Sequence, residues 1–285
     1  MNHLHSNPAL AIQHMPSVKV DTAVGSLAVY DSGKPNPSTH DSVLVLWPSI
    51  LADHRIYLKQ LAAWKRTHRV ILIDGPGHGA SGPAPGAFTM ESCADAQAQI
   101  LDRLGIVQPI VSIGTSWGGL VGGEFALKYP TRTKGLVMLN TPVYPSKRSL
   151  SNRMICWGAR WMHGLTPYTD GVARAFFLPE TRATQPGVLR AFHDHLHQAN
   201  GHALALSVSS VLLEREDLAS RMNLISVPTL FIAGEHDDMY PMESLRQAAA
   251  RLPKGQFVAL PTAHISSVDA PEATVKAIDA FLSIL

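Results

Sequence analysis

The sequence has few charged residues, few cysteines and no long apolar run, and each shortage excludes a class of protein. Only 16% of the 285 residues are charged, and 24 Lys and Arg nearly balance 22 Asp and Glu. The net charge of +2 gives no basis for a nucleic-acid-binding or polybasic membrane-binding surface. Two cysteines, Cys93 and Cys156, are too few for a disulfide framework or a four-cysteine zinc site. No stretch reaches the roughly 18 uninterrupted apolar residues that a membrane-spanning helix needs.

The beginning of the sequence has no targeting pattern. The segment MNHLHSNPALAIQHMP lacks a basic stretch followed by an apolar one, so we expect no secretory signal. We expect residues 1–16 to form a flexible tail and the protein to be cytoplasmic. The remainder is rich enough in hydrophobic residues, which make up 46% of the chain, to fold around a substantial core.

Short β-rich runs alternate with helical runs along most of the chain. This alternation predicts an α/β fold with a mostly parallel sheet and helices on both faces. Continuous apolar runs such as Val43–Trp47 are typical of strands buried on both faces. The segment 146–222 has helical stretches but no β-rich run. We therefore predict an α/β core of 17–145 and 223–285, with 146–222 as a helical cap over the carboxyl edge of the sheet, where such folds bind ligands.

Residues 114–118 read Gly-Thr-Ser-Trp-Gly, a G-x-S-x-G motif between a predicted strand and a predicted helix. A serine on such a sharp turn needs a strained backbone, and small flanking residues make room for it. The following helix presents N–H groups and the positive end of its dipole beside Ser116. The motif alone arises by chance in about one chain in ten of this length. Its position between strand and helix indicates a nucleophilic serine.

A nucleophilic serine needs a base, and the base needs an acid that orients it. His264 follows the last predicted strand and is the best candidate base. His236 is the runner-up, but it shares its loop with most of the candidate acids. His78 lies in a Gly-His-Gly turn, where a structural hydrogen bond is the better interpretation. Asn140, not an acid, stands at the end of the strand predicted over 135–139. The candidate acids are Asp237, Asp238, Glu235 and Asp269.

Acyl transfer also requires N–H donors for the negative charge that develops on the substrate oxygen. The residue after the nucleophile, Trp117, is expected to supply one backbone N–H. The loop after Val43–Trp47 is expected to supply the second. Because Pro48 has no N–H, either Ser49 or Ile50 must do so.

Two further clusters are candidate ligand sites. Residues 193–197 read His-Asp-His-Leu-His, which places His193 and His197 on one helix face, but no HExxH pattern accompanies them. We interpret this segment as a solvated helix and expect neither a metal nor another cofactor. Trp157 and Trp161 in the cap belong either to packing or to an apolar substrate pocket.

With these motifs in view, the chain resembles proteins of the α/β-hydrolase fold. Carried over residue by residue, the resemblance implies Ser116 as nucleophile, Asp237 as acid and His264 as base. Asp237 is preferred because its distances from Gly234 and Pro241 match the family's usual spacing. The segments that carry the resemblance are Val43–Tyr57, Arg69–Ser81, Gly114–Gly119, and Gly234–Pro241 with His264.

One departure from the family concerns the oxyanion loop. Many members have His-Gly where this chain has Pro48-Ser49, so the usual position of the second N–H donor falls on Ile50. Ser49 takes this role if the register differs by one residue, and Ser49 is also a candidate contact for substrate.

The resemblance implies a serine hydrolase that cleaves an ester, thioester or lactone of a small molecule through an acyl-enzyme. A carbon–carbon bond hydrolase, an acyltransferase and a weakly catalytic ligand-binding protein are the alternatives. No nucleic-acid partner and no membrane span are expected, and a homodimer is left open.

Overall fold

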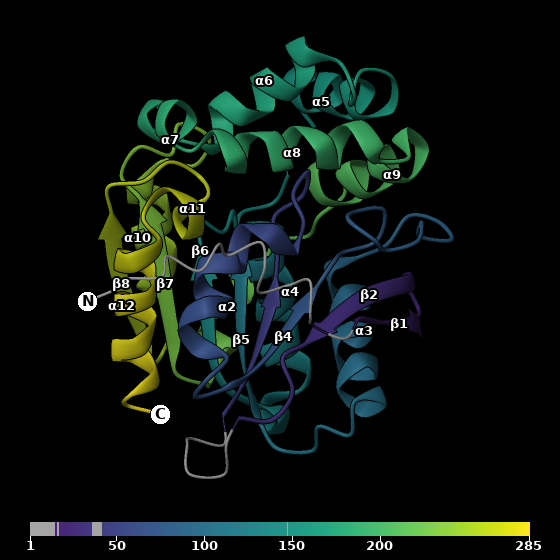
Figure 1. Cartoon of the computed structure of the whole chain (residues 1–285). Coiled ribbons are helices and arrows are strands. Elements are labelled where there is room, and N and C mark those ends of the chain that lie inside the picture. Colours follow the sequence, from purple (N-terminus) through teal and green to yellow (C-terminus); the bar gives the residue numbers. More distant parts are fainter. Residues whose placement is uncertain (1–14, 16, 36–41, 147) are drawn as a thin grey trace, which may run out of the picture.

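The computed structural model describes residues 15, 17–35, 42–146 and 148–285, and its strands form one eight-stranded sheet (Figure 1). The predicted N-terminal tail, 1–16, therefore lies almost wholly outside the described residues. The strands are β1 (Ser17–Thr22), β2 (Gly25–Asp31), β3 (Val43–Trp47), β4 (Arg69–Ile73), β5 (Ile110–Thr115), β6 (Thr133–Leu139), β7 (Thr229–Gly234) and β8 (Gly255–Leu260).

The strand order is β1-β2-β4-β3-β5-β6-β7-β8. β2 pairs antiparallel with both β1 and β4, and every other neighbouring pair is parallel. All side chains of β3, β5 and β7 are buried, as their continuous apolar runs predict. At the edge of the sheet, β1 exposes most of its side chains. The predicted α/β class with a mostly parallel sheet is confirmed.

Helices pack against the sheet between successive strands. α3 packs on α4, and α2 packs on α12. The helix predicted after the G-x-S-x-G motif is present as α4. The four residues of α11 are too few to be predicted from a periodic pattern. The helices of this part are η1 (His54–Tyr57), α2 (Leu58–Trp64), α3 (Met90–Arg103), α4 (Trp117–Lys128), η2 (Pro130–Arg132), α10 (Met242–Ala249), α11 (Ser266–Asp269) and α12 (Pro271–Leu282).

Between β6 and β7 the chain leaves the sheet and forms a helical layer above one end of it (Figure 1). Within this layer α5 packs on α9 and α6 packs on α8. Proline lies in the first turn of α6, α7 and α8. It favours the start of a helix because N–H groups in the first turn have no intrahelical acceptor, so the N–H that proline lacks is not missed. The helices are α5 (Leu150–Trp161), α6 (Thr166–Phe176), α7 (Pro179–Thr184), α8 (Pro186–Gln198), α9 (Gly201–Leu212) and η3 (Ala219–Leu224).

None of the helices in the described part of the chain is both long and apolar enough to cross a membrane.

Candidate active site

Ser116 occupies the sharp turn between β5 and α4. Its backbone adopts φ 55° and ψ −110°, a conformation that costs a non-glycine residue about 1–3 kcal/mol. The turn is possible because Gly114 and Gly118 lie too close together for side chains. A Cβ on Gly114 would collide with the backbone of Gly118, and a Cβ on Gly118 would collide with the Trp47 carbonyl. The fold thus holds the Ser116 side chain at the end of the strand.

His264 and Asp237 lie at the same edge of the sheet and form a buried hydrogen bond. His264 Nδ1 lies 2.8 Å from Asp237 Oδ2. The backbone N–H groups of Met239 and Tyr240 donate to Asp237 Oδ1 at 3.0 and 3.3 Å. Burial alone would raise the pKa of Asp237, but the charge of His264 and these hydrogen bonds hold it below its ordinary value. An ionised Asp237 accepts a hydrogen bond from Nδ1–H of His264, which leaves Nε2 as the basic nitrogen.

The other candidate acids and the second candidate base have different positions. Glu235, His236 and Asp238 are exposed, whereas Asp237 is 5% exposed. Asp269 accepts the backbone N–H of Ala263 at 2.9 Å through Oδ2 and that of Leu178 at 3.1 Å through Oδ1. Asp269 therefore secures the chain next to His264 and is not bonded to its ring. Of the four candidate acids, Asp237 is the one hydrogen-bonded to His264.

Asn140 is a site residue whose role the sequence did not reveal. It sits at φ 47° just after β6. Its Nδ2 donates to Asp237 Oδ2 at 3.1 Å and to the Ala263 carbonyl at 3.2 Å, and its Oδ1 accepts from Ser266 Oγ at 2.6 Å. One amide thus connects the loop of Asp237 with the loop of His264. Its position at the carboxyl end of a strand is the feature of the sequence that could have indicated a role in the site.

Replacing Asn140 by glycine tests this bridge, because glycine tolerates the positive φ but removes the amide. A hydrogen bond to a charged group contributes about 1.5–3 kcal/mol, so kcat on an ester should fall roughly 10- to 100-fold while KM changes little. Steady-state kinetics with a thermal melt as the folding control measures this. An unchanged kcat would show that Asp237 keeps His264 oriented without Asn140.

In the described part of the chain, the loop after β3 and the start of α4 each present a backbone N–H group without an internal acceptor. Ala52 N donates to the Ser49 carbonyl at 3.3 Å, and Leu51 N donates to His78 Nε2 at 2.9 Å. Leu51 has φ 59°, which turns the chain sharply beside Ile50. Within the described residues, neither Ile50 N nor Trp117 N has a hydrogen-bond acceptor. These are the two donors expected for an oxyanion hole.

His78 anchors this loop as a neutral imidazole. Its Nδ1 lies 2.9 Å from the Pro76 carbonyl, so Nδ1 carries the proton and Nε2 accepts from Leu51 N. Burial and the nearby His195 ring lower the pKa of His78 to about 4. The structural hydrogen bond expected for His78 is present, and it acts on the residue next to Ile50.

This burial predicts an acid-sensitive contribution to stability. The native chain keeps His78 neutral down to about pH 4, whereas the unfolded chain protonates it near 6.5. The unfolded state therefore binds more protons, and wild-type stability should fall by on the order of 1–2 kcal/mol between pH 7.5 and 5 from this group. His78→Leu leaves Leu51 N unpaired, at a cost of about 1–3 kcal/mol at pH 7.5.

Urea unfolding at pH 7.5 and pH 5 measures both effects. The leucine variant lacks the titrating group, so the stability gap between it and the wild type should narrow at pH 5. A gap that is the same at both pH values would contradict a neutral buried His78.

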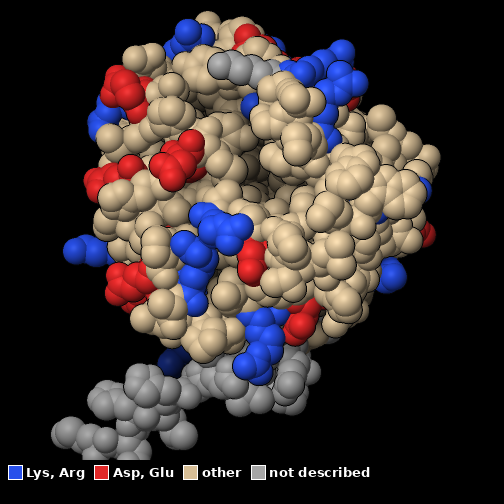
Figure 2. All heavy atoms as spheres, turned by 90° about the horizontal axis from the view of Figure 1, so that it is seen from above, with Lys and Arg blue, Asp and Glu red and all other residues tan. Residues whose placement is uncertain are grey.

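Ser116, His264, Ser49 and Ile50 line one cavity of about 750 Å³ beneath the helical layer. Phe176 and Tyr240 contact the His264 ring, with centroids 5.4 and 5.5 Å away. Seen from above, the helical side of the molecule is hollowed, and mostly uncharged side chains surround the hollow (Figure 2). The remaining wall residues are mainly apolar and come from α5, α6, α9 and the loops around Pro142 and Met239.

Comparison with known proteins identifies the family. The model of the family described as alpha/beta hydrolase fold matches residues 42–271. The chain belongs to this family. It is 26% identical over 243 residues to 3-oxoadipate enol-lactonase 2 of Acinetobacter baylyi, covering 84% of this chain and 88% of that protein. The resemblance seen in the sequence is confirmed.

Solved structures of other hydrolases superpose on most of the chain. A thermophilic esterase from Thermogutta terrifontis gives a TM-score of 0.84 at 27% identity, covering 94% of this chain and 98% of that one. The enol-lactonase from Burkholderia xenovorans gives 0.82 at 25% identity, covering 94% and 100%. The chain is an alpha/beta hydrolase enzyme.

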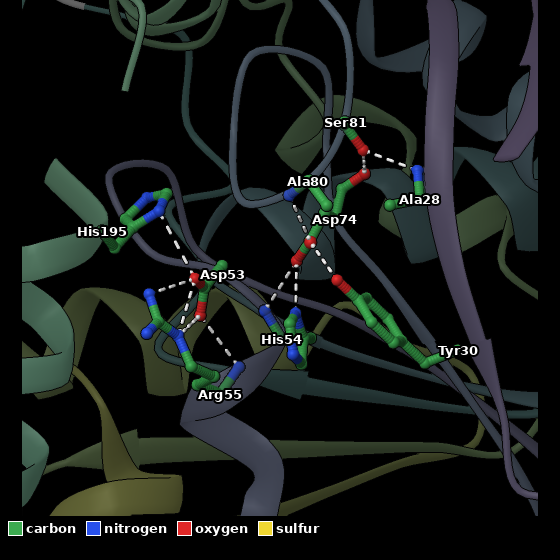
Figure 3. A network of polar contacts seen from close by, with 9 residues as sticks. All are labelled: Ala28, Tyr30, Asp53, His54, Arg55, Asp74, Ala80, Ser81 and His195. Atoms are coloured by element: carbon green, nitrogen blue, oxygen red, sulfur yellow. Dashed lines mark hydrogen bonds and ion pairs between the residues drawn. The ribbon is translucent and has the colours of Figure 1, made fainter. Parts of the chain in front are cut away.

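A buried polar network surrounds the start of η1 (Figure 3). Asp74 accepts from His54 N at 2.9 Å and from Tyr30 Oη at 3.2 Å, and its Oδ1 lies 2.8 Å from His54 Nδ1. Burial alone would lower the pKa of His54, but the hydrogen bond and charge of Asp74 raise it. This cluster fixes the start of η1, which follows the oxyanion loop directly.

The same network joins the helical layer to the sheet (Figure 3). Asp53 pairs with Arg55 Nη2 at 2.7 Å, and His195 of α8 approaches Asp53 Oδ2 with Nδ1 at 3.3 Å. Asp53 is 4% exposed and His195 is 5% exposed. α8 is therefore held against the loop that carries Ile50.

The histidines of α8 do not converge on one point. His193 lies 3.3 Å from Asp170, His195 turns to Asp53, and His197 lies 3.4 Å from the Gly164 carbonyl. Among the described residues, no group of three or more His, Cys, Asp or Glu is arranged to hold a metal ion.

Trp157 and Trp161 lie on the outer side of α5. They are 58% and 64% exposed, and neither lines the cavity, whereas Asn152 and Ile155 of the same helix do. The expectation that these tryptophans contact substrate is not supported by their positions. Both sides of α5 carry apolar residues, so the sequence could not tell which side faces inward.

Proposed function

We propose that the enzyme is a serine hydrolase that cleaves an ester, thioester or lactone bond through an acyl-enzyme. The observation that carries the proposal is the buried Asp237–His264 hydrogen bond in the cavity that also holds Ser116. Two unpartnered backbone N–H groups, of Ile50 and Trp117, support it, because acyl transfer develops negative charge on an oxygen.

Each residue has one role in this mechanism. Ser116 Oγ attacks the carbonyl carbon while its proton passes to His264 Nε2, and Asp237 stabilises the resulting imidazolium. The carbonyl oxygen becomes an oxyanion and accepts hydrogen bonds from Ile50 N and Trp117 N. The bond to the leaving group then breaks, and His264 returns the proton to it. A water molecule then attacks the acyl carbon while His264 takes its proton. The acyl–serine bond breaks, His264 returns the proton to Ser116 Oγ, and the carboxylic acid is released.

The names of the relatives support the substrate class. An enol-lactonase and an esterase both act on a carboxylic ester linkage, which is cyclic in the lactone. We further propose that segment 146–222 acts as a cap that forms the upper wall of the cavity, with Ser49 as a substrate contact on the lower wall. The helices within this segment contribute many of the cavity residues.

A panel of 4-nitrophenyl esters of increasing chain length, together with simple lactones, tests the proposal. We expect turnover of at least one substrate, with a burst of 4-nitrophenol wherever deacylation is slower than acylation. A carbon–carbon hydrolase would turn over a β-diketone but none of the panel. An acyltransferase would form more amide or ester than acid when an amine or alcohol acceptor is added. A ligand-binding protein would turn over nothing.

A further inference from the structure

The cavity contains one fixed charge besides the candidate catalytic residues. Arg215 is the sole Lys, Arg, Asp or Glu among the described residues that line it. Its neighbours in the wall are apolar or neutral, such as Val211, Leu212 and Leu245. Arg215 is half-buried, and its charge attracts an anion that enters the cavity.

No described carboxylate pairs with Arg215, although acidic residues flank it in the sequence. Glu214 pairs with Arg148, and Glu216 lies 3.9 Å from Arg221. Arg221 also pairs with Glu124 on α4. The acids on either side of Arg215 are thus directed to other arginines, and its own charge stays uncompensated within the described part of the chain.

Two backbone carbonyls hold the guanidinium in place. Arg215 Nε donates to the Tyr144 carbonyl at 3.0 Å, and Nη1 donates to the Val211 carbonyl at 3.3 Å. These bonds orient the planar group but do not neutralise it. The Arg215 side chain also hydrogen-bonds the Tyr240 hydroxyl. A guanidinium has five N–H groups, so donors remain for a ligand in the cavity.

Arg215 lies near the reacting groups. The Arg215 side chain hydrogen-bonds the Tyr240 hydroxyl, and this bond and the charge of Arg215 oppose the rise that burial causes in the pKa of Tyr240. The Tyr240 ring in turn contacts the His264 ring at 5.5 Å between centroids. One aromatic ring therefore separates the charge from the candidate base.

We propose that Arg215 binds a carboxylate on the acyl part of the substrate, so that the enzyme acts on half-esters of dicarboxylic acids or on lactones that carry a carboxylate. This inference rests on the proposed function. The carboxylate takes no part in bond breaking and serves to position the scissile carbonyl over Ser116. A single guanidinium with apolar neighbours matches a monoanion, whereas a phosphate dianion usually requires more cations or a helix N-terminus.

Matched pairs of esters test the preference in the wild-type enzyme. Monoethyl succinate, glutarate and adipate each carry one carboxylate, and their diethyl esters carry none. At pH 8, measured by acid release, at least one half-ester should exceed its diester about 10- to 100-fold in kcat/KM, the range of a hydrogen-bonded charge pair. The gain should appear mainly in KM and shrink with added salt, because the interaction is partly exposed.

Two substitutions assign the preference to Arg215. Arg215→Gln should lower the half-ester/diester ratio of kcat/KM to about one, and Arg215→Lys should retain part of it, since lysine keeps the charge but loses the planar fork. Arg153→Gln is the matched control. It removes the same charge from α5, but Arg153 is exposed and does not line the cavity, so the ratio should not change.

The outcomes separate this inference from the proposed function. Turnover of both ester types with no preference in the wild type would overturn the role of Arg215 and leave the hydrolase proposal standing. A preference that Arg215→Gln retains would overturn it too. If neither ester is turned over, the panel of 4-nitrophenyl esters and lactones decides the hydrolase proposal, and the carboxylate site is tested by calorimetric titration of glutarate. Binding to the wild type that Arg215→Gln abolishes would support the site, and no binding would overturn it.

Discussion

Ser116→Ala should lower kcat on a good ester by a factor on the order of 10⁴ to 10⁶, the loss seen when a triad nucleophile is removed. The reason is geometric. Ser116 is the one hydroxyl held on the strained turn between β5 and α4, next to the free N–H of Trp117 and in the same cavity as His264. No neighbouring hydroxyl has this arrangement, since Thr115 Oγ1 is hydrogen-bonded to Tyr57 at 2.7 Å.

The fold should survive this substitution. Ser116 Oγ makes no capping hydrogen bond, so its loss removes little stabilising energy, although the strained φ remains. Circular dichroism and a thermal melt serve as the control. A well-folded alanine variant with near-wild-type turnover would remove the serine from the mechanism.

Asp237→Asn should cost on the order of 10⁴ in kcat, by analogy with the same change in another triad. The amide cannot stabilise the imidazolium formed during attack. Its NH₂ group can also donate to His264 Nδ1, which would put the ring proton on Nε2, where the base is needed. Asp237 lies 2.8 Å from His264 and is almost fully buried, so water cannot replace it.

Asp238→Asn is the matched control, because it makes the same chemical change one residue away. Asp238 is exposed, and an exposed carboxylate away from the ring contributes little, so we expect less than about a tenfold loss. kcat for both variants is measured on one ester, with circular dichroism to confirm folding. A crippled Asp238→Asn variant would move the acid by one residue. If neither variant is crippled, Asp237 is not required, and Asp269 becomes the next residue to test.

Much of the sheet could be predicted because its signals are local. Val43–Trp47 is apolar at every position, and all five side chains are buried in β3. The nucleophile motif could likewise be recognised, because its residues are consecutive in the sequence. Its glycines are required by contacts within the strand–turn–helix unit and with the adjacent strand.

Features that depend on contacts between distant segments could not be predicted. Asn140 meets Asp237 and Ser266 only because three parallel strands end side by side, and these partners are 97 and 126 residues away in the sequence. The sequence could not show that Arg215 lacks a carboxylate partner among the described residues, because its acidic neighbours in the sequence pair with other arginines. The positions of Trp157 and Trp161 depend on which side of α5 packs on α9, which a helix with apolar residues on both sides does not reveal.

Covalent labelling with a fluorophosphonate tests the central claim, an activated Ser116, most directly. The reagent reacts with a serine that has an oriented base and an oxyanion hole, and it does not depend on knowing the substrate. Intact-protein mass spectrometry of the wild type should show one added phosphonyl group, and peptide mapping should place it on Ser116, with no adduct on Ser116→Ala. An enzyme that hydrolyses esters but carries the label on another residue, or carries none, would contradict the account.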